Sequence, residues 1–244
     1  MKELSETSSL ATEAYTVVRE RILAGELQLG QVISRRTLAA ELGMSFLPVT
    51  EALLRLQLEG LLECRPRAGT RVRIPSPEDV RGLFIVREAL ETQAARIVSE
   101  TASAKERAEL KRLANRVDAL SSRDDRRAYA RLHHQLHSRI ADFARCAPLR
   151  EAIEKTQALS TIWFCTIGEP GTHSSSTRHR DLVDAIVEGT PNEAVDAVRH
   201  HIADGAVRTL ELLEPYFRLR TRKRSFDRSG RSVRNSPPPS PLPN

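Results

Sequence analysis

The most constraining feature of the chain is the break Pro75-Ser76-Pro77, because the periodicity of the sequence changes there. Ahead of the break, short helical segments lead into a β-hairpin pattern, whereas the periodic segments behind it have the 3.6-residue repeat of a helix. Proline lacks a backbone N–H donor and interrupts both kinds of element. We therefore expect a mostly α-helical chain in two parts, a small domain at residues 1–74 and an all-helical domain at residues 75–217.

Residues 12–74 carry the signals of a winged helix-turn-helix. A first amphipathic segment ends at Gly25, and Ser34 and Ser45 stand where the N-caps of two further helices are expected. The predicted order is helix 12–24, helix 35–42, turn 43–44, helix 45–60, and a hairpin of 61–64 and 70–74. This is the order of elements in a winged helix-turn-helix, which places its third helix in the major groove of DNA.

The second part is predicted to form a bundle of about six helices. Its start signals are Pro77 at the first position of a helix and the capping boxes Ser103-x-x-Glu106 and Thr190-x-x-Glu193. The expected helices begin at 76 and 103 and then span 126–144, 148–167, 177–188 and 191–213, with a loop at 168–176.

The net charge of +6 is concentrated in the last segment of the chain. Residues 218–244 contain eight basic residues and one acidic residue, so the other 217 residues sum to about −1. This segment is rich in Arg, Ser and Pro, cannot bury a core, and is expected to be disordered. Aromatic residues make up 4% of the chain, too few for a platform on which single-stranded bases stack. The overall charge is therefore no argument for a nucleic-acid-binding fold.

The expected cellular compartment follows from three features that we do not find in the sequence: a membrane-spanning segment, a secretory signal and paired cysteines. No apolar run approaches the roughly 20 residues that span a bilayer, and the N-terminus has no apolar segment typical of a secretory signal. Cys64, Cys146 and Cys165 are scattered, without a paired spacing. We expect a cytoplasmic protein that does not associate with a membrane.

The candidate DNA contacts lie at the two N-caps, on the third helix and in the wing. In a winged helix-turn-helix the first residues of the third helix face the base edges. The candidates are Ser34, Arg35, Arg36, Ser45, Phe46, Thr50, Arg67 and Gly69. Two alternatives remain at this point: a winged helix used only for protein contacts, and a wing whose arginines form only a solvated face.

Four histidines have a spacing that predicts a metal site. His179 and His201 each lie eleven residues from Thr190, so two helices folding back at Gly189-Thr190-Pro191 bring both imidazoles to the same level. His133 and His137 are four residues apart and share one helix face. An all-imidazole set favours Zn²⁺ or Ni²⁺ over a harder ion such as Mn²⁺. The alternatives are a core histidine at His137, or a site that binds its ligand directly through imidazoles.

The remaining histidines fit this site poorly. His134 and His200 point about 100° away from the candidate ligands on their helices, so we expect them at the surface. His173 lies in the expected loop without a partner spacing.

The first part resembles the GntR family of bacterial repressors. The similar stretches are VRERILAGELQLG, LAAELGMS, PVTEALLRLQLEGLLE and RPRAGTRV, in this order. The family pattern after the second helix usually reads SRTPVREAL, with two arginines that reach guanines or phosphates. Here Phe46 and Thr50 replace both arginines, so the resemblance implies an altered operator, in which Phe46 or Leu47 touches a thymine methyl group.

The second part resembles the FCD domain, the helical ligand-binding domain of FadR-like GntR regulators. The similar stretches are VREALETQAARIV, HHQLHSRIADFARCAPL and HRDLVDAIVEGTPNEAVDAVRHHI. In many members, Asp or Asn, a His four residues later and two further His hold a divalent metal. The resemblance implies that His137, His179 and His201 are ligands here, while His133 occupies the Asp/Asn position.

The same resemblance implies an effector. An arginine at the position of Arg87 faces the effector cavity, where its guanidinium can bind a carboxylate. The alternative is a simple pair of Arg87 with Glu91, four residues on. The implied effector is a small organic or sugar acid that is chelated to the metal and held by Arg87.

Three classes of function fit these features. The first is a metabolite-responsive regulator that acts as a homodimer on pseudo-palindromic, double-stranded operator DNA. The second is a zinc hydrolase using the histidine cluster, although the sequence has no HExxH motif and no evident general base. The third is a nonspecific DNA- or RNA-binding protein that acts through the basic tail.

Overall fold

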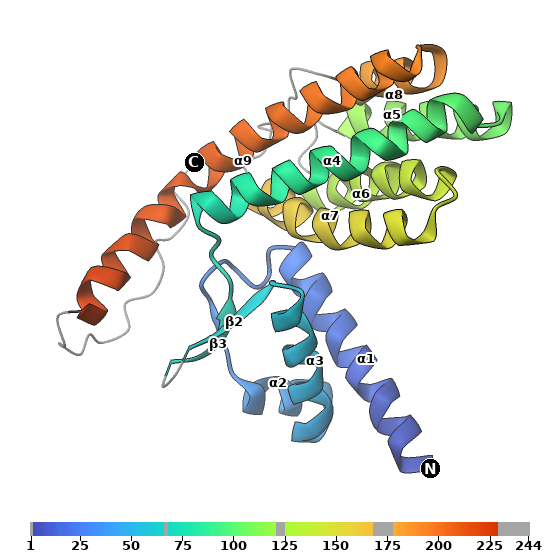
Figure 1. Cartoon of the computed structure of the whole chain (residues 1–244). Helices are drawn as coiled ribbons and strands as arrows, with labels where there is room; N and C mark the ends of the chain where they lie inside the picture. The colour runs from blue at the N-terminus through green and yellow to red at the C-terminus, as the bar shows by residue number, and fades with distance from the viewer. Residues whose placement is uncertain (1, 66–67, 121–124, 168–177, 229–244) are drawn as a thin grey trace.

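The computed structural model describes residues 2–65, 68–120, 125–167 and 178–228. Its N-terminal part, below the helical bundle in Figure 1, is the expected winged helix-turn-helix. The order is α1 (Lys2–Leu23), β1 (Val32–Ile33), α2 (Arg35–Leu42), α3 (Phe46–Leu58), β2 (Leu62–Arg65) and β3 (Gly69–Val72). The first helix begins earlier than predicted, while the third helix and the hairpin strands end within two residues of their predicted limits.

Local signals account for the helix-turn-helix. The Ser34 hydroxyl accepts a hydrogen bond from the backbone N–H of Thr37, and Gly43 ends α2 in the left-handed conformation at φ +63°. Ser45 occupies the N-cap of α3, but its side chain makes no capping hydrogen bond, unlike the cap that we expected. The stripe of α3 is buried as predicted, against α1: Val49, Leu53, Leu56 and, from α1, Val18 and Ile22.

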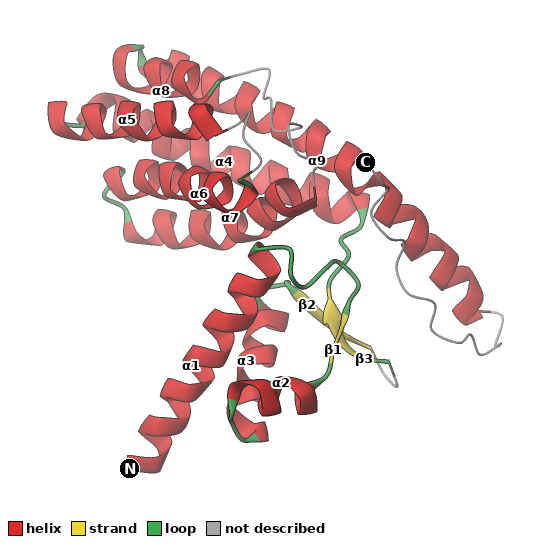
Figure 2. Cartoon of the chain, turned by 180° about the vertical axis from the view of Figure 1, so that it is seen from behind, coloured by secondary structure: helices red, strands yellow, loops and turns green. Residues whose placement is uncertain are grey.

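The wing contains one strand more than the sequence predicted. β1 pairs antiparallel with β3, which pairs antiparallel with β2, so β3 is the central strand (Figure 2). β1 has only two residues, of which Ile33 is buried and Val32 exposed. A strand this short shows no alternation that a sequence pattern can reveal.

In the described part of the chain, the C-terminal domain is a bundle of six helices, as predicted. α4 and α9 lie side by side, α6, α7 and α8 pack against α4, and α5 packs on α6 and α8 (Figures 1 and 2). Ser76 with Asp79, Ser103 with Glu106, and Thr190 with Glu193 form capping boxes. The helices are α4 (Pro77–Thr101), α5 (Ala104–Leu120), α6 (Arg126–Phe143), α7 (Ala147–Ile167), α8 (His179–Glu188) and α9 (Pro191–Arg228). The predicted loop at 168–176 lies outside the described residues.

The last helix is longer than the sequence analysis predicted. α9 continues through Pro215 to Arg228, so residues 218–228 are helical rather than disordered. The expected disorder rested only on the inability of this segment to bury a core. Extending an existing helix is much easier than nucleating one, and Arg, Lys and Leu are good helix formers. Residues 229–244 lie outside the described part of the chain.

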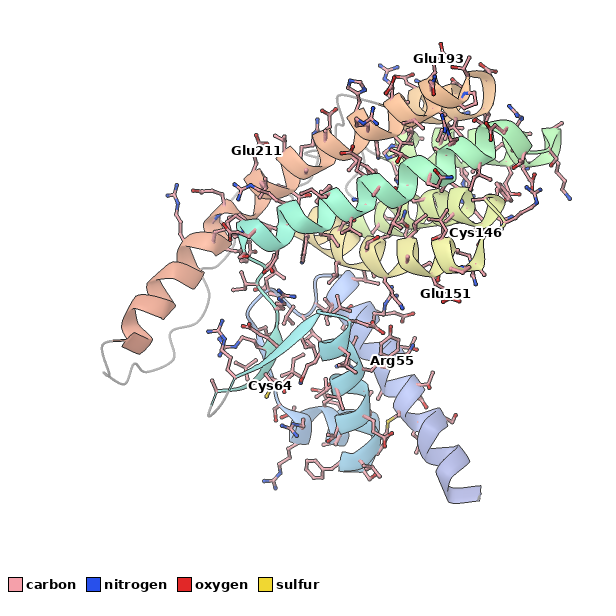
Figure 3. All side chains as sticks on the ribbon, viewed as in Figure 1. Arg55, Cys64, Cys146, Glu151, Glu193 and Glu211 are labelled. Atoms are coloured by element: carbon pink, nitrogen blue, oxygen red, sulfur yellow. The ribbon has the colours of Figure 1, made fainter. Side chains whose placement is uncertain are left out.

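No single described helix is long and apolar enough to cross a membrane. Among the described helices, one pair, α2 and α3 taken together, reaches the length and composition of a membrane span, and the chain bends by 117° between these two helices. Cys64 in β2 and Cys146, between α6 and α7, are free and exposed, and they lie in different parts of the molecule (Figure 3).

Candidate metal centre and nucleic-acid interface

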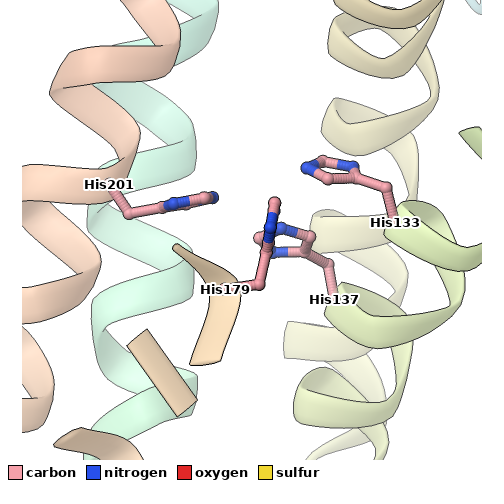
Figure 4. A group of neighbouring side chains, drawn as sticks. All are labelled: His133, His137, His179 and His201. Carbon is pink, nitrogen blue, oxygen red and sulfur yellow. The ribbon is translucent and has the colours of Figure 1, made fainter. Parts of the chain in front are cut away.

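The structure brings together the four histidines that the spacing predicted (Figure 4). α6 supplies His133 and His137, α8 begins with His179, and α9 supplies His201. One ring nitrogen from each residue lies within 4.8 Å of the corresponding nitrogen of every other. The ring centroids of His179 and His201 are 5.1 Å apart, so the two helices fold back as the equal spacing about Thr190 indicated.

The turn between α8 and α9 is fixed by its own residues. Thr190 and Glu193 close the capping box that starts α9. At Gly189 a Cβ atom would lie 2.5 Å from the backbone oxygen of Ala185, which is closer than real Cβ atoms come. Glycine is therefore required for this tight turn, and the turn sets the level at which His179 meets His201.

Asp118 of α5 positions His179. Its Oδ1 lies 3.0 Å from Nδ1 of the His179 ring and 2.9 Å from the backbone nitrogen of His179, while its Oδ2 accepts the backbone N–H of Arg180 at 3.1 Å. Burial raises the pKa of Asp118, but these hydrogen bonds outweigh it and lower the pKa below its usual value. Because an ionised carboxylate only accepts, Nδ1 of His179 is the donor in this contact, and Nε2 is the ring nitrogen that does not face Asp118.

Glu91 of α4 plays the same part for His137. Its Oε2 lies 3.1 Å from Nδ1 of His137, and its Oε1 accepts a hydrogen bond from Nε of Arg87 at 2.7 Å. Burial raises the pKa of Glu91, but the Arg87 charge and the His137 hydrogen bond bring it well below the usual range. Glu91 is thus ionised, and Nε2 of His137 is left with its lone pair.

The donor set fits a divalent metal ion. Nε2 of His137, Nε2 of His179 and Nδ1 of His201 are buried and have no hydrogen-bond partner among the residues that the structure describes. Burial, with smaller contributions from the neighbouring histidines and Arg87, lowers the pKa of His133 and His201 well below the usual value, and burial also lowers that of His137. Neutral rings held by carboxylates through their second nitrogen are the form in which histidine binds metals.

Arg87 takes part in two features of the structure. It pairs with Glu91, and it also lines a small cavity next to the histidines. Glu91 entered the sequence analysis only as a pairing partner, and Asp118 did not enter it at all. No spacing signal could have found Asp118, because it lies on another helix, 61 residues before His179.

The other histidines stand apart from the cluster. His200 is exposed as predicted, and its Nδ1 lies 2.7 Å from the backbone oxygen of Asp196. His134 is partly buried rather than fully at the surface. His173 lies outside the described residues.

Most of the candidate DNA contacts that the structure describes are exposed. Ser34, Arg35, Arg36 and Ser45 are exposed, and Phe46 and Leu47 leave 57% and 59% of their surface open at the start of α3. Thr50 is half-buried and donates its hydroxyl to the backbone oxygen of Phe46. Gly69 is exposed at φ +75°, and Arg67 lies outside the described residues. Large apolar side chains exposed where the third helix begins are suited to contacts with thymine methyl groups.

Other arginines of the wing are paired within the protein. Arg65 and Arg71 both reach Glu63, at 2.9 and 3.7 Å, and Arg73 pairs with Asp79 at the start of α4. Their charges are therefore partly compensated, whereas no carboxylate pairs with Arg35 or Arg36 among the residues that the structure describes. The fold thus defines a winged-helix protein with a second, all-helical domain.

Comparison with known proteins identifies both parts. Residues 10–72 match the family described as bacterial regulatory proteins, gntR family, and residues 83–204 match the FCD domain. A protein of Paenarthrobacter nicotinovorans, named a probable D-xylose utilization operon transcriptional repressor, is 30% identical over 83% of this chain and 89% of its own. The transcriptional repressor RspR of Escherichia coli is 23% identical over 64% of this chain and 68% of its own.

A solved structure has the same fold. A GntR transcriptional regulator from Rhodococcus sp. RHA1 superimposes with a TM-score of 0.71 at 22% identity, over 83% of this chain and 98% of that one. The chain is therefore a DNA-binding transcription regulator and not an enzyme. It belongs to the GntR family, in the branch that carries an FCD domain.

Proposed function

We propose that the protein is a repressor whose affinity for operator DNA responds to a small organic or sugar acid bound beside a divalent metal in the helical domain. The observation that carries this proposal is the set of three buried imidazole nitrogens that have no partner within the described part of the chain, two of them on rings held by ionised carboxylates. Leaving such groups unsatisfied costs about 1–3 kcal/mol each, which a bound ion would recover.

His137, His179 and His201 would hold the ion, with His133 as the fourth ligand. Zn²⁺ or Ni²⁺ suits an all-imidazole set best. The ion would bind a carboxylate of the effector, and Arg87 in the cavity wall would donate hydrogen bonds to the same acid. The sugar-utilisation repressor among the relatives supports a sugar-derived acid as one candidate.

The contact between the domains offers a way to couple the two sites. Ser160 of α7 lines the cavity, and the preceding Leu159 lies next to Gly60, just beyond the end of α3. A Cβ atom built on Gly60 would be 3.8 Å from the Leu159 side chain. We propose that the acid shifts α7 and with it α3, which changes DNA affinity by a coupling on the order of 1–3 kcal/mol.

We also propose that the protein works in the cytoplasm as a homodimer built mainly through the helical domain. One winged helix reads only a few base pairs, so two are needed for a pseudo-palindromic operator. Sedimentation of the full chain at micromolar concentration should give a dimer, and a monomer would contradict this part.

The test combines metal analysis with DNA binding. Purified protein loaded with Zn²⁺ or Ni²⁺ should hold about one ion per chain, and a His179→Ala/His201→Ala variant should hold none. A panel of organic and sugar acids should then raise the melting temperature and change operator affinity only for the loaded wild type. A wild type that binds no metal would overturn the site. A loaded protein whose DNA affinity no acid alters would overturn the sensing role.

A further inference from the structure

The cavity beside the histidines has an unusual charge. Its wall includes His133, His179, His201, Ser160 and two arginines, Arg87 and Arg208, and none of the described residues that line it is acidic. A divalent ion at the histidines would add two more positive charges. A cavity of this kind attracts anions. Each positively charged side chain in it that has no acidic partner in the protein can bind one anionic group of a ligand.

The two arginines of this cavity differ in their partners. The charge of Arg87 is matched, because its guanidinium pairs with the buried Glu91 at 2.7 Å and lies over the Phe84 ring at 5.0 Å. Arg208 of α9 is half-buried, and within the described part of the chain no hydrogen bond or ion pair reaches its guanidinium. This holds although Asp204 and Glu211 lie four residues before it and three residues after it on the same helix.

Arg208 is placed at a definite distance from the metal site. It follows His201 by seven residues, close to two helical turns, so both side chains leave the same face of α9 about 10 Å apart along the axis. Between them lies Gly205, where a Cβ atom would come within 3.2 Å of Phe84 Cε1. Because Gly205 has no side chain, the surface of α9 between His201 and Arg208 does not fill the cavity at this position.

We propose that Arg208 is a specificity-determining residue that binds a second anionic group of the effector. The effector is then an acid with one carboxylate at the metal and another carboxylate or a phosphate at its far end. A guanidinium binds either group through two parallel hydrogen bonds. This inference rests on the proposed function, namely that an acid binds beside the metal.

The experiment is calorimetric titration of the zinc-loaded full chain with three probes. These are 2-hydroxyvalerate, 2-hydroxyglutarate and 3-phosphoglycerate, which share a chelating end and differ at the far end. The wild type should bind at least one of the two doubly anionic probes about tenfold more tightly than 2-hydroxyvalerate. A tenfold difference corresponds to about 1.4 kcal/mol. Which of the two binds more tightly tells whether the far group is a carboxylate or a phosphate.

Three variants make the test specific. Arg208→Gln should lose the tenfold preference and leave 2-hydroxyvalerate affinity within about twofold of the wild type. Arg208→Lys should keep part of the preference, which shows that the charge and not a damaged fold is responsible. Arg199→Gln removes an exposed arginine of the same helix that pairs with Glu88, and it should change nothing. Zinc content should be equal in all four proteins.

The outcomes separate this inference from the proposed function. If the wild type binds 2-hydroxyvalerate as tightly as both doubly anionic probes, or if Arg208→Gln weakens all three equally, Arg208 has no such role and the acid-sensing function stands. If no acid binds the zinc-loaded wild type, the proposed function fails, and this inference fails with it.

Discussion

Asp118 and His179 are joined by two contacts to one carboxylate oxygen: Oδ1 of Asp118 lies 3.0 Å from the His179 ring nitrogen and 2.9 Å from its backbone nitrogen. The N-cap residue of α8, Arg178, makes no side-chain capping bond, so Asp118 performs the capping from another helix. One side chain thus fixes both the start of α8 and the orientation of a candidate metal ligand.

Replacing Asp118 should weaken metal binding without removing a ligand. In Asp118→Asn the amide can present an N–H to Nδ1 of His179, which favours the wrong tautomer. We expect zinc affinity to fall roughly 10–100-fold, as is common when the carboxylate behind a histidine ligand is lost. Competition with a chelating dye measures this. Asp181→Asn, an exposed residue in the same first turn of α8, is the control, and equal affinities of both variants would disprove the positioning role.

Removing Glu91 should strongly destabilise the helical domain. Glu91→Ala leaves Arg87, which is 5% exposed, without its buried partner. Breaking a buried pair in this way costs about 3–5 kcal/mol. Urea denaturation of the metal-free protein measures the loss. The neighbouring Glu88 pairs with Arg199 at the surface, so Glu88→Ala should cost at most about 1 kcal/mol. Similar losses for both variants would contradict the difference in burial.

Two glycines should respond to alanine in opposite ways. Gly189→Ala places a Cβ atom 2.5 Å from the Ala185 oxygen, so the turn must shift, at a cost of about 1–3 kcal/mol. The shift should also lower zinc affinity, because the turn sets the level of His179 and His201. Gly82→Ala, inside α4 with nothing within 4 Å, should stabilise the protein by about 0.5–1 kcal/mol. Thermal melts of both variants check the signs.

DNA binding should depend on the exposed arginines at the start of α2. Alanine at Arg35, Arg36 and Arg67 should weaken operator binding and lower the slope of log affinity against log salt by about two to three units, close to one for each lost phosphate contact. The matched control removes three exposed basic residues of α5, Lys105, Arg112 and Arg116. A slope that stays the same in the first variant would refute the interface.

The lowered pKa of Glu106 predicts that the stability of the protein depends on pH. Hydrogen bonds from the Ser103 backbone N–H and hydroxyl, together with Arg145, lower the pKa of Glu106 to about 2. A carboxyl group whose folded pKa is depressed stabilises the protein above its unfolded pKa of about 4.3, and the contribution disappears as the pH falls towards 2. Urea midpoints should therefore fall more steeply between pH 5 and 2 in the wild type than in Glu106→Gln. Parallel curves would rule out this contribution.

Local patterns made much of the fold predictable. The caps at Ser34, Ser76 and Thr190 and the stripe of α3 are signals between neighbouring residues, and the elements that they predict are present. β1 was missed because two residues show no alternation, and its pairing with β3 depends on contacts nearly forty residues away in the sequence. The end of α9 was missed because helix extension needs no buried face.

The candidate site shows the same difference between features that local patterns predict and features that depend on packing. The meeting of His179 and His201 was predictable because both belong to one helical hairpin, and that of His133 and His137 because they share a helix face. The carboxylates behind these rings come from α4 and α5, and only the packing of the bundle brings them there. Arg208 gave no signal either, since a single arginine on an amphipathic helix is ordinarily a solvated residue.

The absence of a negative charge on the four imidazole ligands has a consequence for how the regulator would respond to metal and acid. Because the four imidazoles supply no negative charge and the Glu91 charge is already matched by Arg87, the Asp118 carboxylate beside His179 would offset only part of the charge of a divalent ion, and an external counter-ion would offset the rest. Ion and acid would then strengthen each other's binding by the same factor, as thermodynamic reciprocity requires. Such a pocket would respond only when both ligands are present. Acid without metal, or metal without acid, would leave the affinity for operator DNA unchanged.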